Sequence, residues 1–120
     1  MPLVEVLHTG LPDKSLLRIK GLLKESVAKE LDCSDTDPDG ALTPENINVR
    51  FRTYGPHDDA ALEVDVLVIA KRFDGRAADL EERTGRIRDH LCRNLGDATA
   101  VVGVFVTLPE SGWAMGYPGD

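Results

Sequence analysis

The sequence predicts an α/β fold in which two tandem β-α-β units form one four-stranded sheet with both helices on one face. The first observation is a repeat: Val-Glu-Val-Leu at residues 4–7 recurs as Val-Asp-Val-Leu at residues 64–67, an offset of 60 residues. Each copy precedes an amphipathic helix pattern and then a second strand pattern. The length of 120 residues is near the commonest size of one domain. We therefore expect a single domain over residues 1–120, with repeat units at about 2–54 and 62–108 and a C-terminal tail at 109–120.

Both expected helices carry one apolar stripe, because their apolar residues recur every three or four positions. In the first helix these positions are Leu16, Ile19, Leu23, Val27 and Leu31, and in the second they are Ala77, Leu80, Thr84, Ile87, Leu91 and Leu95. Asp13 and Asp74 are typical first residues of a helix, and Gly96 is typical of a helix end. The sequence thus predicts one continuous helix in each unit.

Two further strands follow the helices. Residues 47–54 alternate apolar and polar side chains, which predicts a half-buried strand. Residues 100–108 form a β-branched run around Gly103, which predicts a more buried strand. Residues 55–61 would connect the two units. Because the strands carry apolar residues on both faces, we expect a partner subunit to cover the sheet face that the helices leave open.

The element order alone leaves two architectures open. A ferredoxin-like sandwich has the same β-α-β-β-α-β order as two tandem β-α-β units. The repeated four-residue strand favours the tandem arrangement.

Composition excludes several classes of function. With 14 basic and 21 acidic side chains the net charge is −7, which argues against a sequence-independent nucleic-acid binder. No apolar run reaches the roughly 18–20 residues that span a bilayer, and the N-terminus does not resemble a signal peptide. Cys33 and Cys92 are too few for a disulfide scaffold and have no metal-type spacing. We expect a cytoplasmic protein with free thiols.

No motif predicts a metal or a cofactor. Residues 35–40 begin like a calcium-binding EF-hand loop, but the closing glutamate is missing because position 46 is Asn. An acidic surface loop is the better interpretation. A Gly-rich phosphate loop and a nucleophile elbow are also missing, so the sequence supports neither a nucleotide cofactor nor serine hydrolysis.

Three segments carry a resemblance to a known family. They are Met1-Pro2 followed directly by the apolar strand of residues 3–6, the segment Leu-Thr-Pro-Glu-Asn-Ile-Asn-Val at 42–49, and the tail Ser-Gly-Trp-Ala-Met-Gly at 111–116. Together, over nearly the whole chain, they resemble the tautomerase superfamily, which includes 4-oxalocrotonate tautomerase, macrophage migration inhibitory factor and malonate semialdehyde decarboxylase. The tail resembles the decarboxylase branch. The resemblance implies a homotrimer.

Pro2 is the candidate catalytic residue that the resemblance implies. Removal of Met1 would leave Pro2 with a secondary amine at the chain end. An ordinary α-amino group has a pKa near 7.7–8.0, and burial and nearby cations would both lower that pKa. Such an amine can take a proton from carbon next to a carbonyl, and its protonated form can act as an acid. A retained Met1 would instead leave a tertiary amide with no basic lone pair, and Pro2 would then be a structural residue.

A substrate carboxylate needs cations. The resemblance to the decarboxylase branch places them just after the third strand, where this chain has Lys71, Arg72 and Arg76. A guanidinium can hold a carboxylate with two hydrogen bonds, and a helix N-terminus adds positive charge. The alternative is a solvated helix start. Glu45 lies near the place of an acidic residue in the decarboxylase. Trp113 is expected to cover an apolar pocket, which could be that of a neighbouring subunit, or else to anchor the tail.

These observations predict a cofactor-independent tautomerase that moves a proton on a 2-oxo or enol carboxylic acid through Pro2. One alternative is a decarboxylase or hydratase of a small oxo acid that resembles malonate semialdehyde decarboxylase. A second alternative is a non-catalytic trimeric domain, or a ferredoxin-like ligand-binding module. The expected partners are a small carboxylate substrate and further copies of the chain, without nucleic acid or membrane.

Overall fold

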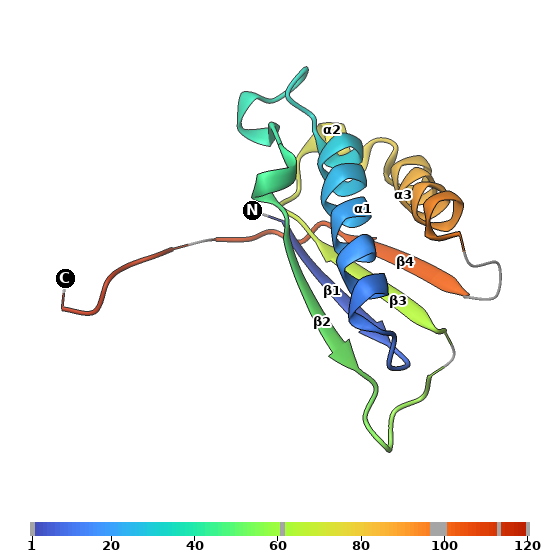
Figure 1. Cartoon of the computed structure of the whole chain (residues 1–120). Helices are drawn as coiled ribbons and strands as arrows, with labels where there is room; N and C mark the ends of the chain where they lie inside the picture. Colours follow the sequence, from blue (N-terminus) through green and yellow to red (C-terminus); the bar gives the residue numbers. More distant parts are fainter. Residues whose placement is uncertain (1, 61, 97–100, 113, 120) are drawn as a thin grey trace.

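The computed structural model describes residues 2–60, 62–96, 101–112 and 114–119. The elements follow the predicted order, with two short 3₁₀ turns added between the first helix and the second strand (Figure 1). In chain order they are β1 (Leu3–His8), α1 (Asp13–Leu31), η1 (Pro38–Gly40), η2 (Pro44–Asn46), β2 (Asn48–Thr53), β3 (Val64–Ile69), α2 (Asp74–Ala77), α3 (Leu80–Leu95) and β4 (Val102–Thr107).

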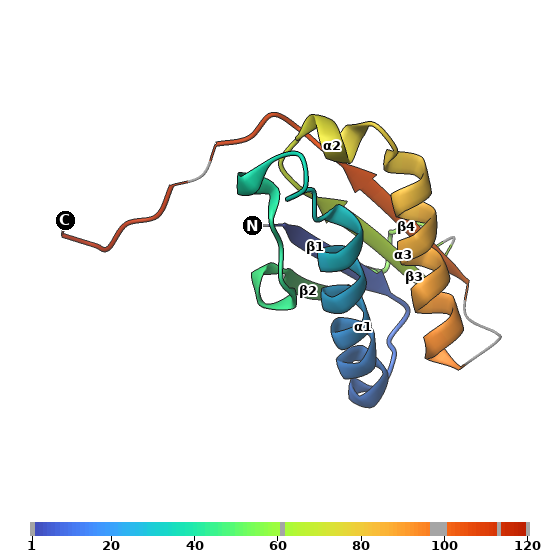
Figure 2. The same ribbon diagram turned by 90° about the horizontal axis from the view of Figure 1, so that it is seen from above.

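The sheet confirms the tandem arrangement. Its strand order is β2-β1-β3-β4, with β1 parallel to β2 and β3 parallel to β4. The two central strands are antiparallel, and Val6 lies opposite Val66, so the two copies of the repeat pair with each other. In a ferredoxin-like fold another strand separates the parallel strands of each unit, whereas here they are neighbours. Both long helices cover the same face of the sheet (Figures 1 and 2).

The core lies between that face and the two helices. The predicted stripe of α1 is buried at Ile19, Leu23, Val27 and Leu31, and that of α3 at Ile87 and Leu91. They pack against Val4, Val6, Val64, Val66 and Val68, all of which have no exposed surface. Burial of each such side chain contributes roughly 1.5–3 kcal/mol. The helical periodicity therefore predicts which face of α1 and of α3 enters the core, although the predicted residues at the helix ends are only half-buried.

One expectation about the second unit was wrong and one was confirmed. The second helix is not continuous, because Asp79 leaves the helical region at φ −135° and ψ 40° and separates α2 from α3. The last strand is, as expected, more buried than β2, because four of its six residues are half-buried and Val106 is buried, although β4 lies at an edge of the sheet. Its Gly103 leaves room for the Leu62 side chain, which a Cβ at that position would meet. Gly96 does end α3, with a left-handed φ of 72°.

Two arginines from the second unit bind the C-terminal end of α1. The last carbonyls of a helix have no partner within the helix. Here Arg83 donates to the carbonyls of Glu30 and Asp32, and Arg76 donates to the carbonyl of Leu31. This arrangement fixes the point at which the chain leaves α1 and enters the loop that carries η1.

The other face of the sheet carries apolar side chains, and none of the helices in the described part of the chain covers it. Leu3 and Leu7 of β1 and Leu67 and Ile69 of β3 are half-buried, and Phe105 of β4 is 63% exposed. The C-terminal tail runs away from the body of the molecule (Figure 1). Within the described residues, no helix is both long and apolar enough to cross a bilayer.

The two cysteines differ in accessibility. Cys33 has no exposed surface, and burial raises the pKa of its thiol, whereas Cys92 is exposed. Because the thiolate is the reactive form, we expect native protein to react rapidly with a thiol reagent such as DTNB at one thiol per chain, and at the second only after unfolding. Cys92→Ser should abolish the rapid reaction. Two rapid thiols in native protein would contradict the buried position of Cys33.

Candidate functional site

A pocket of about 320 Å³ lies at the start of β1. Its lining comes from the start of the chain, the η1–η2 segment and the segment that follows β3, namely Pro2, Asp39, Ala41, Leu42, Asn46, Lys71, Phe73 and Arg76. Because β1 and β3 are antiparallel, with Leu3 opposite Ile69, the start of the chain and the exit of β3 lie side by side. The sheet topology thus brings Pro2 next to the segment after β3 that carries Lys71 and Arg76.

Pro2 is buried and held by the sheet. Its carbonyl accepts a hydrogen bond from the Asn48 backbone N–H at 3.1 Å. This bond continues the pairing of β1 and β2 by one residue beyond β1, so the position of Pro2 is fixed by backbone contacts. Met1 lies outside the described residues.

Lys71 supplies positive charge to the pocket from an exposed position. Its Nζ lies 5.3 Å from the centroid of the Phe73 ring, which is within the range of a cation–π contact. Among the described residues, no carboxylate lies within 4.0 Å of Nζ. The ammonium group is therefore available to an anionic ligand.

Arg76 lines the pocket with a side chain that is almost completely buried. The residue is only 3% exposed, and its guanidinium lies 4.8 Å from the centroid of the Phe73 ring. Three of its N–H groups donate to backbone carbonyls: Nε to Leu31 at 2.6 Å, Nη1 to Lys71 at 2.8 Å and Nη2 to Gly40 at 3.3 Å. Burial lowers the pKa of the guanidinium, but from so high an ordinary value that Arg76 stays charged at neutral pH.

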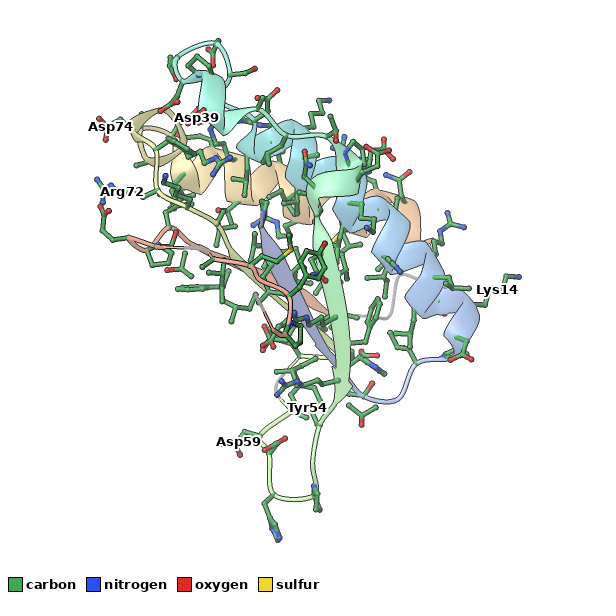
Figure 3. All side chains as sticks on the ribbon, turned by 90° about the vertical axis from the view of Figure 1, so that its left-hand side faces the viewer. Lys14, Asp39, Tyr54, Asp59, Arg72 and Asp74 are labelled. Atoms are coloured by element: carbon green, nitrogen blue, oxygen red, sulfur yellow. The ribbon has the colours of Figure 1, made fainter. Side chains whose placement is uncertain are left out.

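The other predicted site residues lie outside this pocket or outside the described residues. Arg72 is exposed, and its side chain extends outward from the molecule (Figure 3). Glu45 lies in η2 and lines a separate surface depression with Lys20 and Lys24. Hydrogen bonds from its own backbone N–H and from the Thr43 hydroxyl lower the pKa of the Glu45 carboxyl. Trp113 falls outside the described residues.

The acidic residue of the pocket is Asp39, which the sequence did not indicate. Asp39 lies in η1, whose start is capped by the Asp37 carboxylate as it accepts the Asp39 N–H at 3.1 Å. Asn46 was also missed; its Oδ1 accepts from the Thr43 backbone N–H at 2.8 Å and closes the η2 turn. The signals were present as Asp-Pro-Asp-Gly and Thr-Pro-Glu-Asn, two turn motifs before a strand. A sequence alone does not show that the two turns face one pocket.

The pocket therefore combines three kinds of group. A buried proline at the start of the chain can present an amine once Met1 is removed. Lys71 and Arg76 make one side cationic, and Asp39 provides a carboxylate. Such a set can bind a small organic anion and move protons on it.

Comparisons of sequence find no matching protein-family model and no matching curated protein. Comparisons of structure find many matches. FG41 malonate semialdehyde decarboxylase, inhibited by 3-bromopropiolate, matches with a TM-score of 0.64 and 17% identity over 98% of this chain and 91% of that chain. A fused 4-OT (4-oxalocrotonate tautomerase), a symmetric trimer, matches with a TM-score of 0.61 and 16% identity over 98% of this chain and 92% of that chain.

A macrophage migration inhibitory factor-like protein from Entamoeba histolytica matches with a TM-score of 0.60 and 9% identity, over 97% of this chain and 96% of that chain. These three proteins share one superfamily, and each match spans almost the full length of both chains. The β2-β1-β3-β4 sheet with two helices on one face is thus the architecture that they have in common with this chain. The chain has the fold of the tautomerase superfamily.

Proposed function

We propose that this chain is a cofactor-independent tautomerase that moves a proton on a 2-oxo or enol carboxylic acid. The observation that carries the proposal is the juxtaposition of buried Pro2 with Lys71, whose ammonium has no carboxylate partner among the described residues, in one pocket of about 320 Å³. The volume suits a small acid.

In the proposed mechanism the Pro2 amine, freed of Met1, transfers the proton between oxygen and carbon of the substrate. Burial of Pro2 and the positive charge of Lys71 both disfavour the ammonium form, so the amine is available as a base near neutral pH. Lys71 binds the substrate carboxylate through a charge-assisted hydrogen bond. Asp39, a carboxylate in the same pocket, stabilises the ammonium form that Pro2 has after it takes the proton from oxygen and before it gives the proton to carbon.

The second candidate is decarboxylation or hydration of a small oxo acid. The presence of the Asp39 carboxylate in the same pocket favours it, because a carboxylate can activate water or destabilise a substrate carboxylate close to it. In a decarboxylation the bond between the α-carbon and the carboxyl carbon breaks, carbon dioxide leaves, and the electron pair moves to the neighbouring carbonyl as an enolate that then takes a proton.

Of the remaining predicted residues, two have roles that depend on assembly. Arg72 is exposed and follows the pocket residue Lys71 in the chain, so it would attract an anionic substrate from solution. Glu45 lies outside the pocket of its own chain, so we propose that it acts at the pocket of a neighbouring copy. We propose that Trp113 covers an apolar part of such a pocket.

Substrate assays separate the two activities. Wild-type protein is expected to accelerate ketonisation of the enol of phenylpyruvate or of 2-hydroxymuconate, followed by absorbance. A 3-oxo acid such as malonate semialdehyde, followed by release of carbon dioxide, tests the second candidate. Turnover of the oxo acid without ketonisation would favour the decarboxylase, and failure of both would favour the non-catalytic domain.

We also propose that the chain assembles as a homotrimer through the open sheet face. Light scattering at micromolar concentration should give about three times the mass of one chain. Leu67→Asp places a charge at the centre of that face, where Leu67 is half-buried in β3, and should give a monomer. A matched change on an exposed helix position, Leu17→Asp, should leave the trimer intact because Leu17 is 70% exposed on α1. A wild-type monomer would contradict the proposal.

A further inference from the structure

We infer that Arg76 is a positioning residue, which acts by holding three backbone segments around the pocket, and that Lys71 alone makes the ionic contact with the substrate carboxylate. The inference rests on the proposed function and departs from the sequence-based expectation that Arg76 binds the carboxylate itself. The guanidinium of Arg76 is buried and donates three hydrogen bonds to backbone carbonyls, and these two observations support the inference.

The three acceptors of Arg76 belong to three different parts of the chain. The Leu31 carbonyl ends α1, the Gly40 carbonyl ends η1, and the Lys71 carbonyl follows β3. Gly40 lies between two pocket residues, Asp39 and Ala41, and Lys71 is itself a pocket residue. One guanidinium therefore ties the Asp39 side of the pocket to the Lys71 side.

The η1 loop is packed closely against the helix turn that carries Arg76. The Gly40 carbonyl also accepts the Cys33 backbone N–H at 3.1 Å, so Cys33 and Arg76 hold the same oxygen. A Cβ at Gly75 would meet the side chains of Thr36 and Cys33. Because Thr36 and Cys33 lie this close to Gly75, the loop that carries η1 has little space to move toward α2. The hydrogen bond from Arg76 to the Gly40 carbonyl opposes movement of the loop away from α2.

Arg76 and Lys71 differ in how accessible their charged groups are to a ligand. The Arg76 guanidinium is almost fully buried and directs three of its five N–H groups to carbonyls. The Lys71 ammonium is exposed, and both cations contact the Phe73 ring, with centroid distances of 5.3 Å to Lys71 and 4.8 Å to Arg76. Lysine cannot reproduce the planar fork of a guanidinium, so Arg76→Lys would keep the charge but lose the connection between the segments.

Substrate charge distinguishes the two roles. We propose to assay the phenylpyruvate enol and its methyl ester, which has no carboxylate charge, with Arg76→Lys and Lys71→Met. Lys71→Met should raise KM for the acid about 10- to 100-fold and leave KM for the ester little changed. Arg76→Lys should lower kcat at least tenfold for both substrates, with the ratio of acid to ester unchanged. A loss confined to the acid in Arg76→Lys, or an unchanged kcat in the folded variant, would overturn the inference.

Amide hydrogen exchange gives a second readout that needs no substrate. In Arg76→Lys, amides of residues 33–41 should exchange at least tenfold faster than in wild type, whereas Lys71→Met should leave them unchanged. If the protein turns over no enol acid, the proposed function fails, yet the exchange result still decides the role of Arg76. Unchanged exchange in residues 33–41 would overturn the inference. If Arg76→Lys does not fold, Phe73→Leu provides the test, because it removes the ring beside the guanidinium. This variant should show faster exchange in residues 33–41 and a lower kcat, both to a smaller extent than expected for Arg76→Lys. Exchange and kcat equal to those of wild type would overturn the inference.

Discussion

Pro2→Ala is expected to lower kcat/KM for enol ketonisation by about 10²- to 10⁴-fold, the usual contribution of a general acid–base group. The variant keeps a primary amine at the chain end after Met1 removal, so the loss comes from the missing ring, which fixes the direction of the lone pair, and should lie toward the lower end of that range. The fold should be unaffected, because the contact that holds this residue is made by its backbone carbonyl to the Asn48 N–H.

The matched control is Pro56→Ala, which changes an exposed proline in the loop between β2 and β3, away from the pocket lining. It should leave kcat/KM unchanged. Steady-state kinetics with the phenylpyruvate enol, at protein concentrations where the oligomer is intact, provides the measurement. Equal rates for wild type and Pro2→Ala would rule out Pro2 as the proton-transfer group.

Gly40→Ala is expected to lower the free energy of unfolding by about 3 kcal/mol, at the upper end of the usual cost of overpacking. Its new Cβ would clash with Sγ of buried Cys33. The backbone itself is not the cause, because Gly40 is not among the glycines with positive φ. The clash falls on the loop that carries Asp39, so the substitution should also lower kcat.

Urea denaturation of four proteins measures this effect: wild type, Gly40→Ala, Cys33→Ala and the double variant. Because Cys33→Ala removes the clashing atom, the double variant should be more stable than the sum of the single effects predicts, by about 1–3 kcal/mol. Gly21→Ala is the matched control. Gly21 lies in α1 with open space around its Cα, so alanine there should stabilise the protein by about 0.5–1 kcal/mol. Strict additivity of the Gly40 and Cys33 effects would contradict the packing described.

The fold could be predicted because its determinants are local and periodic. The apolar spacing of α1 and α3 and the alternation in β2 each indicate an element, and the repeat at residues 4–7 and 64–67 marks the two units. The repeat is also the place where the two units pair, about Val6 and Val66. The break between α2 and α3 at Asp79 could not be predicted, because no periodic pattern marks it. The position of β4 at the sheet edge could not be predicted either, because it depends on the order of all four strands.

The site could be predicted only in part. Pro2, Lys71 and Arg76 do meet at one pocket, because antiparallel β1 and β3 place the start of one strand beside the end of the other. Asp39 was missed because its position depends on contacts between distant segments, above all the bonds from Cys33 and Arg76 to Gly40. The sequence shows the charge of Arg76, but burial and the direction of its hydrogen bonds appear only in the folded chain.

The central claim is that the Pro2 amine transfers the proton, and it requires that Met1 be absent from the active protein. The most direct measurement is the intact mass, with the N-terminal peptide sequenced by mass spectrometry, of active protein expressed with Met1 as its first residue and no tag before it. We expect a chain that begins at Pro2 with a free secondary amine. Quantitative retention of Met1 in protein that still catalyses ketonisation would contradict the account.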